Sequence, residues 1–176
     1  PPLSAREDTS YYKAPDIKNH PSEESAISVV SWNIQHLGRT KTDEDIRIMA
    51  QILRDFDIIA IQEVVAKDPA GAQAVGRLAN ALSRTGFQWD YQISDPTRSP
   101  SPHIRERYAF LWKPSRVSQV HRASLDRHLE DVIDREPFLG TFRKKRKEER
   151  GDSSKDQARP EEQRPEEERS QGGEEP

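Results

Sequence analysis

The chain has 176 residues, of which 34% are charged and only 32% are apolar, and its formal net charge is −3. This near balance of charge excludes a highly basic nucleic-acid module, so any polyanion must bind at a local site. The absence of cysteine excludes disulfides and thiolate metal sites, and no apolar run approaches the roughly 20 residues of a membrane span. No signal peptide is visible but the chain starts at Pro1, so secreted and cytoplasmic locations both stay open, and no membrane contact or obligate protein partner is indicated.

Composition divides the chain into three segments. Residues 1–26 contain four prolines and no periodic apolar pattern, which predicts a flexible N-terminal arm. Residues 144–176 contain nine Lys or Arg, eleven Asp or Glu and a single apolar residue, Ala158. Such a segment cannot bury enough surface to offset its ordering entropy, so it is predicted to be a disordered charged tail. The remaining segment, 27–143, carries a net charge near +1 and is predicted to fold.

Hydrophobic periodicity predicts alternating strands and helices within 27–143. A continuous β-branched run predicts a buried strand over 27–32, and HLG (36–38) is expected to supply its exit turn. Ile46, Met49 and Leu53 recur at helical spacing after a cap-type and acidic start, which predicts a helix over 43–54. The other expected elements are a strand over 57–63, a helix over 71–84, a loop over 95–102, and strands over 87–93, 107–113, 117–120 and 138–142. This order predicts an α/β layered domain with mixed strand pairing.

Two of the expected strands end in polar side chains that are suited to metal binding. Asn33 follows the first strand and Glu63 ends the second. If these strands are parallel neighbours, the two side chains meet at the edge of the sheet where open α/β sheets place their sites. A carboxylate and an amide are hard oxygen ligands that suit Mg²⁺. Taken alone, this spacing also fits a turn-capping Asn33 and a solvated Glu63, because single polar residues at strand ends are common.

Four motifs extend this hypothesis through a family resemblance. The stretches SWNIQHLG (31–38), IIAIQEV (58–64), RERYAFLWKPSRV (105–117) and DREPFLGTF (134–142) occur in the order and approximate spacing of the deoxyribonuclease I family. That family is part of the wider endonuclease/exonuclease/phosphatase superfamily of metal-dependent phosphoesterases. The resemblance implies a four-layer αββα sandwich with two packed sheets. It also implies hydrolysis of a phosphodiester by an activated water with the assistance of a divalent metal ion, most simply Mg²⁺, with Mn²⁺ or Ca²⁺ as alternatives.

The resemblance also implies roles for five residues. Glu63 matches the metal-ligand glutamate, and Asn33 matches a residue that helps to hold the metal and the phosphate. Glu106 matches a glutamate that pairs with a catalytic histidine and holds its tautomer. Arg135 matches an arginine that contacts a backbone phosphate, for which a planar bidentate donor is well suited. Gln35 matches a position near the DNA backbone.

Several of these positions have simpler interpretations when the family is ignored. Glu106 could pair with neighbouring arginines on a surface strand, and Arg135 could form a weak local ion pair with Asp134 or Glu136. Tyr108, Phe110 and Trp112 alternate along one strand and are predicted to belong to the core rather than to a base-stacking surface. His36 and His121 are expected to be ordinary polar residues, and His103 and His128 lie in loop-like stretches without metal-ligand spacing.

The sequence also departs from the family pattern. The two family residues that probe the minor groove are replaced by Val65 and Ile104, so groove reading of that kind is not expected. The catalytic histidine, the GDFN-like pair and the SDH-like pair of the family's second half do not occur. The chain is therefore expected to be the N-terminal half of the fold, at 27–143, joined to an unrelated tail, as truncation or a frameshift would produce. Its exposed inner sheet face is expected to favour association.

The sequence accordingly predicts a metal-dependent phosphodiesterase, best matched to an endonuclease that acts on DNA, with impaired activity in this chain. General acid–base catalysis without its histidine should lose roughly 10²–10⁴-fold in rate. Two alternatives stay open at this point. One is a phosphomonoesterase or lipid phosphodiesterase of the same superfamily, and the other is a non-catalytic fragment that acts as a binding module.

Overall fold

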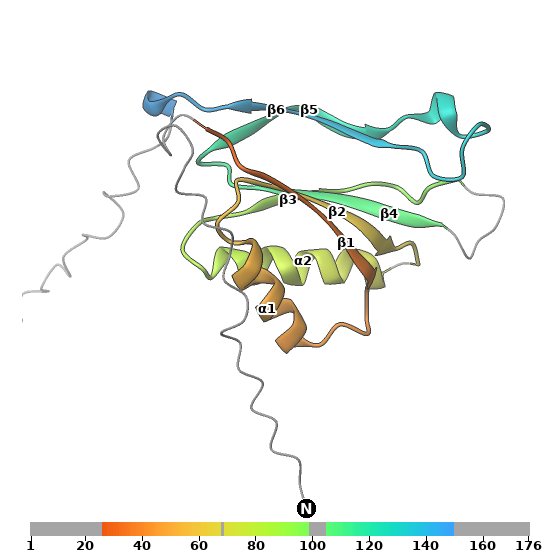
Figure 1. The fold of residues 1–176 in the computed structure, drawn as a ribbon, viewed down its shortest axis with the longest axis horizontal. Helices are drawn as coiled ribbons and strands as arrows, with labels where there is room; N and C mark the ends of the chain where they lie inside the picture. Colours follow the sequence, from red (N-terminus) through yellow and green to blue (C-terminus); the bar gives the residue numbers. More distant parts are fainter. Residues whose placement is uncertain (1–25, 68, 99–104, 150–176) are drawn as a thin grey trace, which may run out of the picture.

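A computed structural model describes residues 26–67, 69–98 and 105–149, which form three layers (Figure 1). A layer of two helices covers one face of a four-stranded sheet, and a two-stranded sheet lies over part of the other face. The mixed α/β class and the two packed sheets therefore agree with the predicted sandwich. The predicted arm, apart from residue 26, and the predicted tail beyond residue 149 lie outside the described residues.

The four-stranded sheet has the strand order β1-β2-β4-β3. Its strands are β1 (Val29–Leu37), β2 (Ile58–Val65), β3 (Asp90–Ile93) and β4 (Glu106–Trp112). β1 and β2 pair in parallel, as a strand–helix–strand crossover requires, whereas β4 runs antiparallel to both β2 and β3. The predicted mixed pairing is confirmed. The carboxyl ends of β1 and β2 and the amino end of β4 consequently meet at one edge of the sheet.

Two predicted boundaries in this sheet were wrong in an informative way. The first strand does not stop at residue 32 but continues through the polar stretch to Leu37. Asn33 therefore lies within this strand and not after its end. The third strand is shorter than predicted and begins only at Asp90. Pairing with a neighbouring strand determines where β1 ends and where β3 begins. The hydrophobicity of the strand's own sequence does not predict this pairing.

The helices follow the predicted pattern closely, because their signals are local. They are α1 (Asp43–Leu53) and α2 (Ala70–Ser83). Thr42 caps α1 in a reciprocal capping box with Asp45, whose side chain accepts from the backbone amide of Thr42. Their apolar faces pack on the sheet around a core in which Leu53, Leu78 and Leu82 are fully buried.

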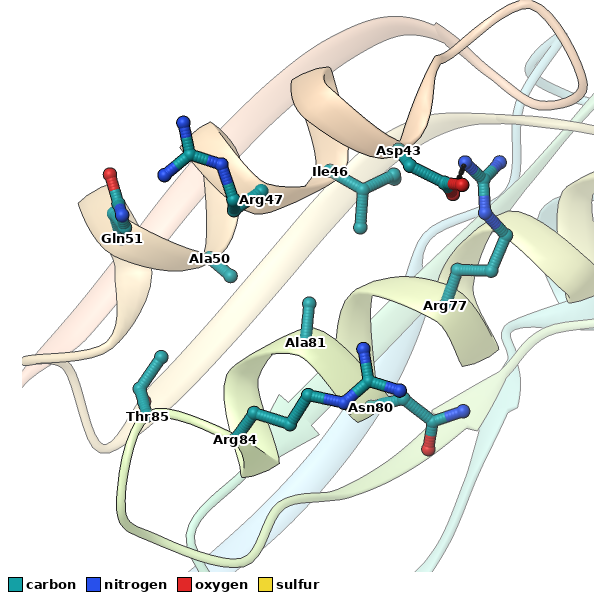
Figure 2. Close-up of a pocket in the computed structure, with 10 residues that line it drawn as sticks. All are labelled: Asp43, Ile46, Arg47, Ala50, Gln51, Arg77, Asn80, Ala81, Arg84 and Thr85. Carbon is teal, nitrogen blue, oxygen red and sulfur yellow. Dashed lines mark hydrogen bonds and ion pairs between the residues drawn. The ribbon is translucent and has the colours of Figure 1, made fainter.

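The outer side of the helix layer carries a groove between α1 and α2 with a volume of 640 Å³ (Figure 2). Three arginines line this groove. Arg77 is bound to Asp43 at 2.5 Å, and Arg47 is bound to Glu44 through both carboxylate oxygens. Most of the positive charge of the groove is therefore neutralised, and the groove lies on the opposite side of the sheet from the residues considered next.

The second sheet pairs β5 (Val117–Leu125) with β6 (Phe138–Lys144), both longer than predicted. A short 3-10 helix, η4 (Arg127–Leu129), lies in the connection between them, and another, η5 (Lys147–Glu149), follows β6. The described fold therefore continues a few residues into the segment predicted to be a tail, whose beginning at residue 144 was placed too early.

Aromatic side chains join the two sheets. Phe110 stacks on Phe138 with ring centroids 5.1 Å apart, and Trp112 packs on Phe142 at 5.4 Å. The prediction that the alternating aromatics of this strand belong to the core is confirmed for Phe110 and Trp112. Gln92 adds a polar link, because its side chain bonds both the amide and the carbonyl of Ala123.

The second sheet leaves the inner face of β1 uncovered. The side chains of Val29, Ser31 and Asn33 on this face are exposed, whereas the alternate residues of β1 pack toward the helices. Polar pairs occupy part of this open surface, since the Gln62 amide donates to Ser31 Oγ at 3.0 Å. Apart from Val29, the uncovered face of β1 therefore carries polar side chains rather than the apolar ones typical of a buried sheet face.

Candidate active site

A bulge in β2 determines where Glu63 points. Ile61 pairs with Ala109 and Val64 with Arg107, so three steps along β2 oppose two steps along β4. Glu63 takes a left-handed backbone conformation at this point, with φ of 58°. Ile61 and Val64 are consequently both buried beneath the helices, although strict alternation would place them on opposite faces. The extra residue brings Glu63 to the same face as Asn33.

Asn33 and Glu63 form a hydrogen-bonded pair across β1 and β2. The Asn33 Nδ2 donates to Glu63 Oε1 at 2.9 Å. Within the described part of the chain neither side chain has another partner, so Asn33 Oδ1 and Glu63 Oε2 stay open. The pairing register shifts just beyond, where four steps from Asn33 to Leu37 oppose two steps on β2. His36 lies in this irregular stretch and also has a left-handed backbone, with φ of 54°.

Glu106 lies at the amino end of β4 on the same inner face. It is only 7% exposed, and its Oε2 lies 3.4 Å from an Arg135 guanidinium nitrogen. Burial raises the pKa of this carboxyl, while Arg135 and a hydrogen bond with the Tyr108 hydroxyl act in the opposite direction. The charge of Glu63 also raises the pKa of Glu106, which places the two carboxylates within electrostatic range. Burial and the Glu106 charge in turn raise the pKa of Tyr108, so its hydroxyl stays a hydrogen-bond donor.

Glu136 anchors the segment that carries Arg135, and sequence reasoning missed it. Its side chain is fully buried and accepts from the Arg98 amide through both oxygens and from Arg127 at 2.6 Å. Burial alone would raise the pKa of Glu136, but hydrogen bonds from its own amide, the Arg98 amide and Arg127 lower it below the usual value. In the sequence Glu136 resembled one of many loop charges. The only feature of the sequence that could have drawn attention to Glu136 was its position next to Arg135.

A closed set of contacts links this anchor to Glu106. Thr97, which is buried, donates its amide to the Glu106 carbonyl at 2.8 Å, and its hydroxyl accepts from the Glu106 amide. The next residue, Arg98, is held by Glu136, and Arg135 returns to the Glu106 carboxylate. These contacts therefore hold the loop that carries Arg135 against the edge of the four-stranded sheet.

The structure thus brings four of the five predicted site residues to one edge of the inner sheet face, as two pairs. Asn33 pairs with Glu63, and Glu106 pairs with Arg135. The alternative for Arg135, a local ion pair with a sequence neighbour, is replaced by this pairing between the loop that precedes β6 and the first residue of β4. Gln35 is exposed on β1, with no hydrogen bond or ion pair among the described residues.

The other predicted positions contribute little to this arrangement. His36, His121 and His128 are exposed, while His103 and Ile104 lie outside the described residues. Val65 is half-buried and packs against Gly38, where an added Cβ would lie 2.6 Å from a Val65 methyl.

The residues present fit a hard divalent cation that needs few protein ligands. No group of three or more histidine or acidic side chains that could enclose a metal ion occurs among the residues described. Mg²⁺ usually keeps several waters and binds through only one or two carboxylates. The open oxygens of Asn33 and Glu63 supply one amide and one carboxylate donor of the required kind.

Comparison with known proteins identifies the family of the chain. The model of the Endonuclease/Exonuclease/phosphatase family matches residues 30–169, and the chain belongs to this family. The resemblance seen in the four sequence motifs is thereby confirmed. A solved family protein from Bacteroides thetaiotaomicron aligns with 54% of this chain and 32% of its own, at 19% identity and a TM-score of 0.38.

Curated relatives are deoxyribonucleases. The chain is 37% identical over 118 residues to a deoxyribonuclease of Thioalkalivibrio sp. (strain K90mix), and 32% identical over 124 residues to human deoxyribonuclease-1. Each alignment covers 66% of this chain. The chain spans 30% of the length of the first relative and 42% of the second. Among the described residues, no helix is both long and apolar enough to cross a membrane.

Proposed function

We propose that this chain carries the metal- and phosphate-binding part of a phosphodiesterase site that acts on DNA. The observation that supports this most is the Asn33–Glu63 pair, which the β2 bulge turns onto the face that also holds Glu106 and Arg135. A left-handed backbone in a strand costs free energy and persists only where the surrounding structure stabilises it. Such strained residues are concentrated at functional sites. The deoxyribonuclease relatives favour DNA over the other phosphoesters that the superfamily hydrolyses.

Each pair has a distinct chemical task in this proposal. Glu63 supplies a carboxylate ligand to Mg²⁺, and Asn33 fixes the orientation of that carboxylate while presenting its own amide oxygen. When bound, the cation polarises a phosphoryl oxygen and neutralises charge that develops during hydrolysis. The chain itself positions the ligands before the metal arrives, so little ordering is needed on binding.

Arg135 and Glu106 act on the substrate side of the site. The Arg135 side chain is 44% exposed, so its guanidinium can reach a backbone phosphate while one nitrogen stays near Glu106. Glu106 is held by Tyr108 and by its backbone bonds to Thr97, which leaves its carboxylate fixed in orientation. A fixed buried carboxylate is the kind of group that orients an imidazole in general acid–base catalysis. Among the described residues, the Glu106 carboxyl interacts with Tyr108 and Arg135, and no hydrogen bond or ion pair joins it to a histidine.

DNA affinity with and without Mg²⁺ tests this proposal. The parent chain should bind a short labelled duplex more tightly when Mg²⁺ is added, and Glu63→Ala should lose this gain because its metal ligand is gone. Glu44→Ala is the matched control, since it removes a carboxylate of equal charge from the exposed face of α1. A Mg²⁺-dependent gain that Glu63→Ala retains in full would remove Glu63 from the metal site.

A further inference from the structure

Tyr108 lies beside the Glu106–Arg135 pair and is joined to it by a hydrogen bond. Glu106, Tyr108 and Phe110 alternate along β4, so their side chains share one face of the sheet. The Tyr108 hydroxyl donates to the Glu106 carboxylate, and burial raises the pKa of Tyr108, so the hydroxyl keeps its proton. The Glu106 carboxylate is therefore shared between two donor groups, the Tyr108 hydroxyl and the Arg135 guanidinium.

Aromatic packing between the two sheets holds the Tyr108 ring. The ring stacks on Phe138 with centroids 6.4 Å apart and an interplanar angle of 14°. Phe138 stacks in turn on Phe110, with centroids 5.1 Å apart. Because these contacts already restrict the ring, the hydrogen bond from its hydroxyl to Glu106 requires little further ordering of the side chain.

The ion pair between Glu106 and Arg135 is loose by comparison. Glu106 Oε2 lies 3.4 Å from Arg135 Nη1, which is beyond the roughly 2.7–3.2 Å of an N–H···O hydrogen bond. An arginine and a carboxylate can instead form a close bidentate pair, which would occupy two guanidinium donors. The side chain of Glu106 is 10% exposed and that of Arg135 is 44% exposed, so the carboxylate lies in the core while the guanidinium extends toward solvent.

We propose that Tyr108 is a positioning residue that keeps the Arg135 guanidinium available to a backbone phosphate by holding the Glu106 carboxylate. This inference rests on the proposed function, in which Arg135 contacts the phosphate. Without the hydroxyl, the buried carboxylate loses a donor and closes on Arg135, because a buried charge left without hydrogen bonds is costly. A phosphate must then compete with Glu106 for the donors of Arg135. Tyr108 thus changes phosphate affinity through Glu106.

The affinity of the full 176-residue chain for a short labelled duplex, measured in EDTA, tests this role without a contribution from metal at Glu63. Tyr108→Phe keeps the stacked ring and removes only the hydroxyl. It should bind the duplex roughly 2- to 10-fold more weakly than the parent, which is the range that one ordinary hydrogen bond supplies. Tyr91→Phe is the matched control, since it removes a hydroxyl that lies beside Gly76 of α2. Its affinity should equal that of the parent.

A double-mutant cycle separates this positioning role from a general structural one. In the Glu106→Gln background no carboxylate can close on Arg135, so adding Tyr108→Phe should change the affinity by no more than roughly 2-fold. A loss as large in this background as in the parent would show that the hydroxyl does not act through Glu106, and the inference would be wrong.

Arg135→Ala distinguishes failure of this inference from failure of the proposed function. If Arg135→Ala weakens binding while Tyr108→Phe binds as tightly as the parent, the positioning role is wrong and the proposed function stands. If Arg135→Ala binds as tightly as the parent, the phosphate contact proposed for Arg135 is wrong, and the role of Tyr108 is wrong with it. If the parent chain does not bind DNA at all, both proposals are wrong.

Discussion

At the scale of single residues, the site depends on side chains placed where their ordinary preferences would not put them. Glu63 has a left-handed backbone although it lies in a strand, and Glu106 is buried although it carries a carboxylate. Each costs free energy that the surrounding contacts must offset. Glu63 gains the bond from Asn33, and Glu106 gains contacts from Tyr108 and Arg135.

The buried Glu106 carboxyl makes stability depend on pH in a defined direction. Burial raises its folded-state pKa above the ordinary 4.5, so the folded protein binds the proton more tightly than the unfolded chain does. The stabilisation from this group is therefore complete below pH 4.5 and is lost as pH rises through the folded pKa. Glu106→Gln, which cannot ionise, should be more stable than the parent at pH 7, and this advantage should shrink toward pH 4.

Urea denaturation from pH 4 to 7 measures this difference. Glu44→Gln is a control of opposite sign, because the bond with Arg47 lowers the pKa of the exposed Glu44, whose small contribution is present above pH 4.5. A stability difference between Glu106→Gln and the parent that does not change with pH would show that burial of Glu106 is not coupled to its ionisation.

At the scale of elements, close packing of α2 on the end of β2 fixes the stretch that contains the bulge. A Cβ on Gly71 would lie 2.1 Å from the Val65 carbonyl oxygen, which no side-chain adjustment can relieve. Gly71→Ala should therefore destabilise the fold by about 1–3 kcal/mol, although alanine is normally the better helix residue. Gly76→Ala in the same helix meets only the end of the Tyr91 side chain, with the hydroxyl oxygen at 3.4 Å, and should stabilise by about 0.5–1 kcal/mol.

Urea denaturation of the two alanine variants and the parent tests whether the free energy of unfolding falls in Gly71→Ala and rises in Gly76→Ala. If Gly71→Ala were as stable as Gly76→Ala, the helix could not be packed against Val65 as the structure places it. A loss in both variants would instead indicate that the whole helix is tightly constrained.

The elements also show what the sequence could and could not predict. Helix α1 was predictable, because its apolar spacing and the cap at Thr42 are both local signals. The extension of β1 through Asn33 and the turn of Glu63 onto the inner face depend on the register between strands, which one strand's sequence does not contain. Glu136 was missed for the same reason, since its partners lie on separate segments. The pairing of Glu106 with Arg135 was not predicted, because family resemblance gave each residue a separate role.

At the scale of the whole molecule, the described residues supply the proposed metal-binding pair and the proposed phosphate-binding arginine but no histidine at Glu106. Groups that act together in catalysis lose most of their effect when one is removed. The purified 176-residue chain should therefore nick supercoiled plasmid at a rate near background, with roughly 10²–10⁴-fold lost for lack of a general acid–base partner. Robust Mg²⁺-dependent nicking that disappears in Glu63→Ala would contradict this expectation.

The central claim is that Asn33 and Glu63 together bind a divalent metal ion, and paramagnetic broadening by Mn²⁺ tests it most directly. In the ¹⁵N-labelled chain, low Mn²⁺ should first broaden the amide signals around Asn33, Glu63 and Glu106. Asn33→Ala should weaken the effect by roughly 10–100-fold, as loss of a ligand's supporting partner does, and Glu63→Ala should abolish it. Broadening centred on the exposed acidic turn at Asp43–Asp45, and unchanged in Glu63→Ala, would contradict the account.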